Sequence, residues 1–536
     1  MSFQAIIREL TKTKIKNLAD LSSFKRRVSK KYKIPCPSNA ELLKEYHKFL
    51  KRKRKKPSKT LESLLKTRPI RSLSGIVNVA VLTKPYPCPG KCLYCPAEKG
   101  IPKSYLSGEP AVERAKLLKF DPWLQTQKRI EMLKNQGHPT DKIQLRIIGG
   151  TFSYYPKKYQ AWFTKECFRA CNHSTPKTSL RSPKEEIEKD LLREQKKNEK
   201  VKHRIVGISV ETRPDFIDEK EIIWLRKLGV TMVELGVQSI YDEVLNLNLR
   251  GHKVKETVLA TKLLRDAGFK ILYQMMPNLP GSDLKKDEKM FEELFENQDF
   301  RPDLLKIYPC AILKEAPLYK WYLKGKYKPY SLKELINLLK KIKLRIPYYV
   351  RIQRIIRDIS SEKVIEGGAK VSNLRQLLAE LSKKEGWQCH CIRCREIKEK
   401  YNQKERIYLF RLDYKASGGK EIFLSFETKN RKKLYSLLRL RVPSQFFTKE
   451  KHFIKALDGA GIIRDIQTFG PLVPIDQKKL APQHRGLGKK LIKEAERILK
   501  KEFRLKKMAV IAGIGARDYF RKQGYKLKET YMIKLF

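Results

Sequence analysis

From Gly75 onward, short apolar runs alternate with longer stretches in which apolar residues recur every three or four positions. The short runs are typical of buried strands, and the longer stretches are typical of amphipathic helices. The predicted strands cover residues 76–83, 143–148, 205–211, 231–237, 269–275 and 304–307. The predicted helices include residues 122–134, 219–227, 254–266 and 284–296. Repeated strand–helix units predict a parallel sheet that is closed, or partly closed, into a barrel.

After about residue 399 the pattern changes to strands that follow one another directly, at residues 406–414, 421–426, 434–441 and 462–469. An amphipathic helix and a further strand come next, at residues 489–501 and 508–512. This order predicts a second, smaller α/β domain. The predicted parts are a basic N-terminal extension (1–70), a barrel domain (71–365), a linking region (366–400) and a C-terminal domain (401–536).

The chain has 536 residues and carries 118 Lys+Arg against 58 Asp+Glu, a formal net charge of +60. This excess favours a large polyanionic partner, above all nucleic acid, with a general enrichment in lysine as the alternative. Six consecutive cations at residues 51–56 favour phosphate contact over a plain solvated surface. The sequence shows neither a secretory core nor an apolar run of about 18 residues, so we expect a cytoplasmic protein that does not enter a membrane.

The candidate chemistry begins after the first predicted strand, in the loop Tyr86-Pro-Cys-Pro-Gly-Lys-Cys-Leu-Tyr-Cys-Pro96. Cys88, Cys92 and Cys95 stand there in a CxxxCxxC spacing, without a fourth cysteine nearby. Zinc sites usually take four protein ligands, so three sulfurs favour a [4Fe-4S] cluster with one open iron. A zinc loop or three unconnected thiols is the alternative.

This loop resembles that of the radical S-adenosylmethionine (SAM) superfamily. The resemblance implies that the open iron binds SAM, and that one electron cleaves SAM to a 5′-deoxyadenosyl radical. Further candidates for binding SAM or substrate lie at or after predicted strand ends: Gly149, Gly150, Glu211, Glu234, Gln238, Ser239, Arg213, Arg250 and His252. The paired glycines would let backbone groups meet a ligand, unless they form an ordinary tight turn.

A second cysteine group, Cys389, Cys391 and Cys394, has a CxCxxC spacing in the linking region. Cys310 is the favoured fourth ligand, and His390 is its competitor. Four such ligands would form a closed, structural Zn²⁺ site that holds the two domains in register.

In the C-terminal domain, a strand leads into a glycine-containing turn at the start of a helix. The turn consists of Gln483, His484, Arg485, Gly486, Leu487 and Gly488. Bare amides and the helix dipole there can cradle a pyrophosphate. The order of elements resembles the GNAT acetyltransferase fold, in which this turn binds acetyl-CoA. Tyr519 would then lie near the thioester, unless it is a packing residue of the last helix.

A radical SAM barrel joined to a GNAT domain resembles the family of the Elongator catalytic subunit, in its archaeal or bacterial stand-alone form. The resemblance covers about residues 68–536. Besides the cysteine loop and the turn, it rests on Glu211-Thr-Arg-Pro-Asp215, Glu234-Leu-Gly-Val-Gln-Ser239, Arg250-Gly-His252, Met276-Pro-Asn-Leu-Pro280 and Leu437-Leu-Arg-Leu-Arg441.

The resemblance implies that the chain installs a carboxymethyl group at C5 of the wobble uridine in a tRNA anticodon stem-loop. Acetyl-CoA would supply the carbon unit through its methyl radical, and CoA would leave by hydrolysis. Lys142 matches a family lysine near acetyl-CoA. The strand residues Asp465, Ile466, Gln467 and Thr468 match the backbone that contacts the cofactor. Phe520 stands where the family often has a second tyrosine.

Two rival functions are a GNAT protein lysine acetyltransferase with a non-reactive iron–sulfur domain and a tRNA-binding scaffold without catalysis. The first needs a general base after the turn, where no clear carboxylate is visible. The second gives the cysteines at 88, 92 and 95 no role. The sequence leaves both a monomer and a homodimer open.

Overall fold

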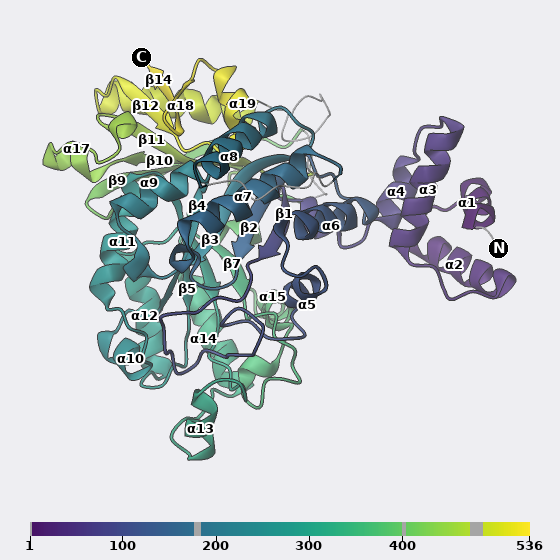
Figure 1. Ribbon diagram of the computed structural model, residues 1–536, viewed down its shortest axis with the longest axis horizontal. Coiled ribbons are helices and arrows are strands. Elements are labelled where there is room, and N and C mark those ends of the chain that lie inside the picture. The colour runs from purple at the N-terminus through teal and green to yellow at the C-terminus, as the bar shows by residue number, and fades with distance from the viewer. Residues whose placement is uncertain (1–2, 176–183, 399–401, 403, 472–485) are drawn as a thin grey trace.

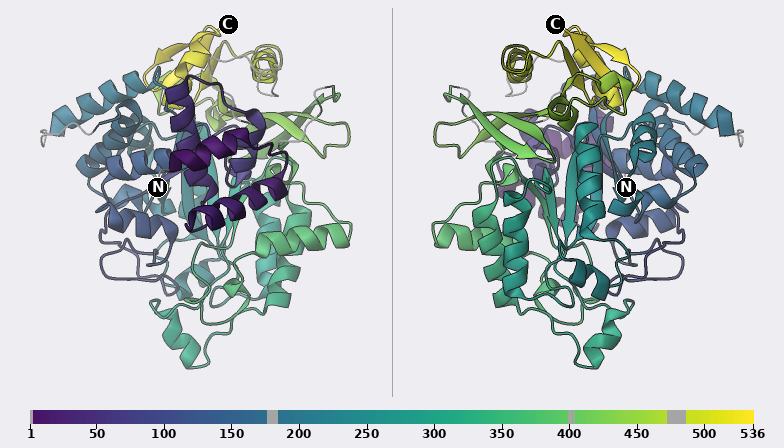
Figure 2. Two further views of the ribbon diagram at one scale, coloured as in Figure 1. Left: turned by 90° about the vertical axis from the view of Figure 1, so that its right-hand side faces the viewer. Right: turned by 90° about the vertical axis from the view of Figure 1, so that its left-hand side faces the viewer.

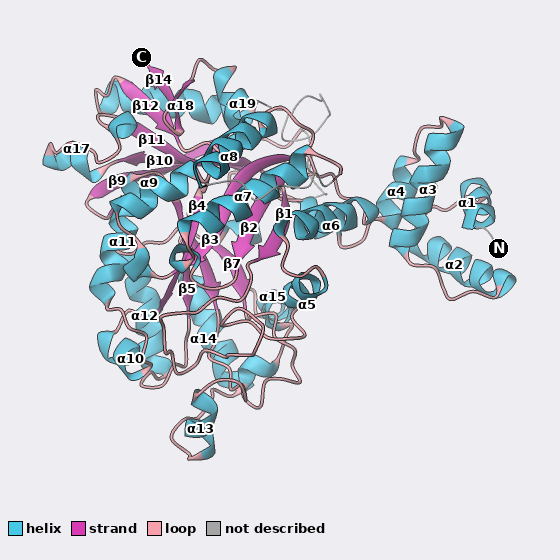
Figure 3. Ribbon diagram, viewed as in Figure 1, coloured by secondary structure: helices cyan, strands magenta, loops and turns pink. Residues whose placement is uncertain are grey.

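The computed structural model describes residues 3–175, 184–398, 402, 404–471 and 486–536 (Figure 1). Two sheets and a separate group of N-terminal helices make up the molecule, and helices cover the outside of the larger sheet region (Figure 3). This is the predicted fold class: a partial parallel barrel followed by a second α/β unit.

The first sheet has seven parallel strands in sequence order. Their bounds are β1 (Val77–Leu82), β2 (Lys142–Ile148), β3 (Arg204–Thr212), β4 (Met232–Gln238), β5 (Lys270–Met275), β6 (Leu304–Ile307) and β7 (Arg351–Ile355). Each strand pairs with the next, and the order ends at β1 and β7, so the described strands form an open barrel.

Helices precede or follow most of these strands. Their bounds are α5 (Pro110–Leu117), α6 (Pro122–Asn135), α7 (Lys157–Asn172), α8 (Lys184–Asn198), α9 (Glu219–Lys227), α10 (Asp242–Leu247), α11 (Val254–Asp266), α12 (Leu284–Glu296), α13 (Leu318–Leu323), α14 (Leu332–Arg345), α15 (Leu374–Lys384) and α16 (Ile392–Arg395). Strand alternation separates two faces: Val77, Val79 and Val81 of β1 enter the apolar core, whereas Asn78 and Ala80 line a cavity inside the barrel. The barrel interior is therefore partly polar.

The second sheet is mixed and has the order β13-β14-β12-β11-β10-β9-β8. Its strands are β8 (Tyr408–Ala416), β9 (Gly419–Glu427), β10 (Leu434–Val442), β11 (Gly461–Thr468), β12 (Lys507–Val510), β13 (Lys526–Lys528) and β14 (Tyr531–Leu535). Its helices are α17 (Ser444–Thr448), α18 (Leu487–Glu502) and α19 (Arg517–Arg521). Only β11 and β12 pair in parallel, over residues 461–463 of β11, so the rest of β11 lacks a partner strand on that side among the described residues.

The second sheet packs against the N-terminal ends of the barrel strands. Asp303, just before β6, forms buried ion pairs with Arg464 of β11 (2.6 Å) and Arg439 of β10 (3.3 Å). Buried apolar residues of both sheets also belong to one continuous cluster. Breaking a buried pair leaves an uncompensated charge, so these contacts fix the two sheets to each other.

Four helices at the N-terminus form a unit with its own apolar core. They are α1 (Phe3–Lys12), α2 (Leu18–Tyr32), α3 (Asn39–Lys53) and α4 (Lys59–Leu65). Capping boxes begin α2 and α3, at Asn17 and Ser38. The unit projects from one side of the barrel, close to α6 (Figures 1 and 2). The cations at residues 51–56 end α3 and follow it, so they lie on this projecting part.

None of the described helices combines the length and the apolar character that crossing a membrane requires.

Candidate active site

A cavity of about 580 Å³ opens at the C-terminal ends of the barrel strands. Cys88, Cys92 and Cys95 line it, together with the predicted residues Gly150, Glu211, Glu234 and Gln238 and the loop arginines Arg213 and Arg250. The volume lies within the range typical of small-molecule sites. Strands β2, β3 and β4, the loops that follow them and the cysteine loop thus bring most of the predicted barrel residues to one place.

The cysteine loop holds its three sulfurs around Gly90. A Cβ atom at Gly90 would lie 3.4 Å from Cys92 Sγ, 3.7 Å from Cys88 Sγ and 2.7 Å from Arg213 Nη1. The three ligand atoms are not all within 4.8 Å of one another, as they would be around one ion. Ligands of a cluster bind different irons and stand farther apart, so this spacing fits an iron–sulfur cluster.

Several buried polar atoms near this loop have no hydrogen-bond partner among the described residues: the donors Tyr94 Oη, Arg213 Nη1 and Arg250 Nε, and both ring nitrogens of His252, one of which carries a proton. Arg250 also donates from Nη1 to Cys92 Sγ at 3.8 Å. Unpaired buried donors are costly unless an acceptor is bound. An electron-rich iron–sulfur cluster supplies such acceptors, so the donor set fits that group.

Burial and the neighbouring thiols Cys92 and Cys88 raise the pKa of Cys95 to about 12. Burial, with Arg250 and Arg213 nearby, lowers the pKa of His252 to about 2, so its ring is neutral at any physiological pH. The Cys95 thiol therefore needs a cation beside it to become a thiolate ligand. The loop is thus suited to metal and unsuited to a free thiolate nucleophile.

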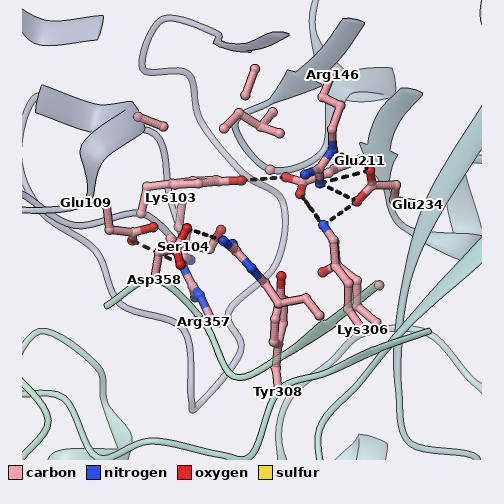
Figure 4. Close-up of a pocket in the computed structure, with 18 of the residues that line it drawn as sticks. Lys103, Ser104, Glu109, Arg146, Glu211, Glu234, Lys306, Tyr308, Arg357 and Asp358 are labelled. Atoms are coloured by element: carbon pink, nitrogen blue, oxygen red, sulfur yellow. Dashed lines mark hydrogen bonds and ion pairs between the residues drawn. The ribbon is translucent and has the colours of Figure 1, made fainter. Parts of the chain in front are cut away.

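An ion-paired group lies deeper in the cavity (Figure 4). Glu234, on β4, pairs with Arg146 of β2 at 3.1 Å and with Lys306 of β6, and it accepts a hydrogen bond from Ser209 Oγ at 3.1 Å. Burial alone would raise the pKa of Glu234, but Arg146 and Lys306 outweigh it and lower the pKa to about 2. The stabilisation by this carboxylate is therefore present above its ordinary pKa and is lost only as the pH falls toward 2.

Glu211, at the end of β3, lies beside this group. It accepts hydrogen bonds from Tyr105 Oη at 2.7 Å and Gln274 Nε2 at 3.4 Å, and it pairs with Lys306 at 3.2 Å. Burial and the charge of Glu211 raise the pKa of Tyr105 well above its usual value. Tyr105 therefore stays a hydrogen-bond donor and fixes one oxygen of Glu211.

The glycine pair after β2 has two different roles. A Cβ at Gly149 would lie 1.9 Å from Thr83 Oγ1, so Gly149 is required by packing. Gly150 lines the main cavity and has a φ of 94°, which favours glycine. Gln238, at the end of β4, also has a positive φ of 70°, and its buried Oε1 has no partner. Gly150 and Gln238 are thus the better candidates for ligand contact.

The predicted acetyl-CoA turn is described from Gly486 onward, while Gln483, His484 and Arg485 lie outside the described residues. Gly486 caps α18 with a φ of 70°. A Cβ at Gly488 would lie 2.9 Å from Tyr519 Oη and 3.7 Å from the side chain of Ile466. The helix start, Tyr519 and β11 therefore meet beside the part of β11 that lacks a partner strand, an arrangement that fits a pyrophosphate with an attached extended arm.

Two other predicted acetyl-CoA residues, Asp465 and Lys142, lie where the second sheet meets the barrel. Asp465 of β11 pairs with Lys270, at the start of β5, at 2.9 Å. Lys142 is the first residue of β2, at the opposite end from Gly149, and is not among the residues lining the cluster cavity. Burial lowers the pKa of Lys142 to about 8, with Arg204 acting in the same direction. Lys142 thus faces the junction rather than the cysteine loop.

The second cysteine group is a candidate metal site. The sulfurs of Cys389, Cys391 and Cys394 lie within 4.8 Å of one another, the spacing of ligands around one ion. The group lies at the N-terminus of α16, and Ile392 N donates to Val350 O at 2.9 Å, just before β7. Lys343 Nζ of α14 donates to Cys394 Sγ at 3.8 Å. The site therefore ties the end of the barrel to the segment that leads to the second sheet.

The structure does not bring Cys310 to this group, which corrects the expectation that it is the fourth ligand. Cys310 follows β6 at the C-terminal end of the barrel and packs in a buried cluster with Cys92, Leu93 and Tyr94. His390, the alternative ligand, stacks on Tyr348 with ring centroids 4.7 Å apart. The described residues supply three ligand atoms to the group.

Sequence reasoning missed Arg146, Lys306 and Tyr105, which hold the two glutamates. Arg146 and Lys306 are isolated cations inside predicted buried strands, a signal that a strand faces a polar cavity. Tyr105 lies in the long loop after the cysteines, and no sequence signal connects it to Glu211.

Comparison with known proteins agrees with this geometry. Residues 86–294 match the model of the radical SAM superfamily, and residues 302–383 match the radical SAM C-terminal domain. The chain is 43% identical to the tRNA uridine(34) acetyltransferase of Methanocaldococcus infernus, over 99% of this chain and 98% of that protein. It is 37% identical to human Elongator complex protein 3, over 89% of this chain and 87% of that protein.

A solved structure, the archaeal Methanocaldococcus infernus Elp3 with N-terminus deletion (1-46), shares 43% sequence identity with a TM-score of 0.73. The match covers 87% of this chain and 100% of that one. Because these similarities extend over nearly the whole chain, the protein belongs to the family of the tRNA uridine(34) acetyltransferases and Elongator complex protein 3.

Proposed function

We propose that this chain modifies C5 of the wobble uridine of tRNA, using SAM, a [4Fe-4S] cluster and acetyl-CoA, to give 5-carboxymethyluridine. The observation that carries the proposal is that one chain holds both a cysteine loop with unpaired buried donors and a Gly488–Tyr519–Ile466 cradle. The relatives named as tRNA uridine(34) acetyltransferases and the net charge of +60 support a tRNA substrate.

Cys88, Cys92 and Cys95 would hold the cluster. When bound, the cluster and SAM supply one-electron chemistry, which allows an unreactive carbon to form a new bond. Arg213 and Arg250 would donate to the electron-rich group, since their free nitrogens are buried against the loop. Gly150 and Gln238 would present backbone and amide groups to SAM.

The ion-paired group at the base of the cavity would orient ligands. Glu234 is locked between Arg146 and Lys306, and Glu211 is fixed by Tyr105. Locked carboxylates present oxygens at fixed positions, so they suit the hydroxyls of a ribose. Ordering these side chains before binding lowers the entropic cost of holding the substrate.

The cradle in the second sheet would bind acetyl-CoA through the first amides of α18 and the part of β11 after residue 463, which has no partner strand on that side among the described residues. Burial raises the pKa of Tyr519, so its hydroxyl remains a donor near the bound cofactor. Cys389, Cys391 and Cys394 would bind zinc as a structural ion at the junction.

Mass spectrometry of wobble nucleosides tests the proposal. The protein is reconstituted anaerobically and given SAM, a reductant, tRNA and acetyl-CoA labelled with carbon-13 in the acetyl group. The expected product is 5-carboxymethyluridine carrying the label in both added carbons, formed only when every component is present. Unchanged uridine together with labelled acetyl-lysine in proteins would instead support a lysine acetyltransferase.

A further inference from the structure

Four arginines line one side of the cluster cavity, next to β1 at the open edge of the barrel. Arg68 and Arg71 lie in the segment that joins the N-terminal helices to β1, Arg114 lies on α5, and Arg129 lies on α6. Three separate segments of the chain therefore direct guanidinium groups to the same wall of the cavity.

These four have no carboxylate partner, unlike most other arginines of the cavity; Arg250, which also lacks one, donates instead to Cys92 Sγ and Gly236 O. Arg357 pairs with Glu109 at 3.3 Å, and Arg354 pairs with Asp358. By contrast, none of Arg68, Arg71, Arg114 and Arg129 forms an ion pair with any carboxylate of the described residues. Their positive charge is thus uncompensated.

Neutral contacts hold two of these side chains in position. Arg114 donates to Ala80 O at 3.1 Å and Pro110 O at 3.2 Å, while its buried Nε has no partner. Arg71 donates to Gln136 Oε1 at 2.5 Å. The side chain of Arg129, on α6, makes neither a hydrogen bond nor an ion pair with the described residues. Carbonyl and amide oxygens orient a guanidinium without cancelling its charge, so donors remain for a ligand.

The group is electrostatically strained. Burial, together with the charges of Arg114 and Arg71, lowers the pKa of Arg129 to about 10. Burial and Arg68 lower the pKa of Arg71 as well. A guanidinium with a pKa of about 10 is still protonated at neutral pH, so the protein holds like charges close together in a partly buried place. Such an arrangement is costly in the absence of an anion.

We propose that Arg71, Arg114 and Arg129, with Arg68 at the rim, form a phosphate subsite for an RNA phosphodiester beside the nucleotide that enters the cavity. This deepens the proposed function and rests on it. Guanidinium groups match phosphate oxygens in a bidentate manner. CoA carries phosphates too, and Arg68 and Arg71 precede β1 near the second sheet, where Gly470 N donates to Leu73 O. Arg114 and Arg129, however, line the same cavity as the cysteine loop, and the residues of the Gly488–Tyr519–Ile466 cradle do not line it, which favours RNA.

Binding of an anticodon stem-loop RNA to the full-length, reconstituted protein tests the subsite without SAM or reductant, so that no turnover occurs. Arg71→Gln, Arg114→Gln and Arg129→Gln should each weaken binding by about tenfold. The matched control is Lys128→Gln, which removes one charge from the same helix as Arg129 at an exposed position paired with Glu131. It should bind nearly as the parent does.

A hairpin with neutral methylphosphonate linkages on both sides of the wobble uridine identifies the ligand. The parent protein should lose about tenfold in affinity for this hairpin, and the arginine variants should lose nothing further. The subsite would be overturned if the losses of affinity from the methylphosphonate linkages and from the arginine substitutions added in full. It would also be overturned if all three variants bound the normal hairpin as tightly as the parent does. A fall in CoA affinity with RNA binding intact would reassign it to CoA.

Thermal unfolding of each variant checks the fold, and Arg114→Lys, which keeps the charge but not the fork, serves where Gln unfolds the protein. The two proposals can fail separately. Arginine-dependent binding with no modified uridine would preserve the subsite and refute the proposed reaction. Labelled product from arginine variants that bind the hairpin normally would support the reaction and refute the subsite.

Discussion

The two cysteine groups use the same residue in nearly the same spacing, yet their geometry differs. The sulfurs of Cys389, Cys391 and Cys394 converge on a point, whereas those of Cys88, Cys92 and Cys95 surround an open cavity without converging. Buried donors without partners lie around the cysteine loop at residues 88–95. At the group formed by residues 389–394, Lys343 already donates to Cys394 Sγ. Spacing along the chain therefore predicts that metal binds, while the separation of sulfurs and the state of nearby donors indicate which kind.

The largest effect should come from Cys92→Ala. Because Cys92 is a buried member of the cavity set that also accepts from Arg250, its loss should remove the cluster and abolish uridine modification. Iron content, visible absorbance and the wobble nucleoside assay measure this, and zinc content and CoA binding should persist. Cys36→Ala, at an exposed cysteine of the N-terminal unit, is the control. A full complement of iron in Cys92→Ala would break the comparison.

Cys391→Ala should have the next largest effect, on stability rather than on chemistry. Loss of the structural ion should lower the free energy of unfolding by about 3 kcal/mol, which corresponds to a fall in Tm of roughly 6–12 °C for a domain of this size. Metal analysis should find zinc lost and iron retained, with calorimetry giving the Tm. If iron is lost and zinc is kept, the roles of the two groups are reversed.

Gly90→Ala should damage the cluster loop without removing a ligand. The new methyl group would press on Arg213 Nη1 at 2.7 Å, so either the arginine or the loop must shift. We expect lower iron content after reconstitution and a loss of about 1–3 kcal/mol in stability. Pro89→Ala, at the exposed neighbouring position, controls for a change in the same loop. Normal iron content in Gly90→Ala would show that the loop is looser than its packing indicates.

Cys310→Ala should have the smallest effect and separates the two groups most directly. Its sulfur packs beside Cys92 and Leu93, away from the group at Cys389, so zinc content should not change. Removal of a buried sulfur should cost about 1 kcal/mol by denaturant unfolding. Any stoichiometric loss of zinc would restore Cys310 as a ligand.

Local sequence pattern predicted strands β1 to β6 well, because each contains an apolar run, whereas β7 (Arg351–Ile355) has three polar residues in five and a weaker apolar pattern. The expected strand at 304–307 coincides with β6, and the expected helix at 254–266 coincides with α11. The N-terminal helices were predicted only as a basic extension, because lysines that do not contribute to the core separate their apolar positions.

Site prediction succeeded where chemistry is local and failed where it depends on distant contacts. The residues of the cysteine loop, and those of the turn that contains Gly488, are close together in the sequence, so their spacing alone indicates the site. Cys310 was misassigned because a zinc site needs four ligands, and Cys310 was an available cysteine to complete the group of three. In the structure, however, Cys310 follows β6 at the opposite end of the barrel. The uncompensated arginines escaped notice because a missing carboxylate is visible only in three dimensions.

The length of β2 has a consequence for the proposed reaction. Lys142 and Ile148 bound a strand of seven residues, so its ends lie roughly 20 Å apart. The cysteine loop belongs to one end and the junction with the second sheet to the other. In the proposed reaction, the barrel wall would therefore separate the radical chemistry from the bound thioester, and delivery of the acetyl group would be a separate event in time.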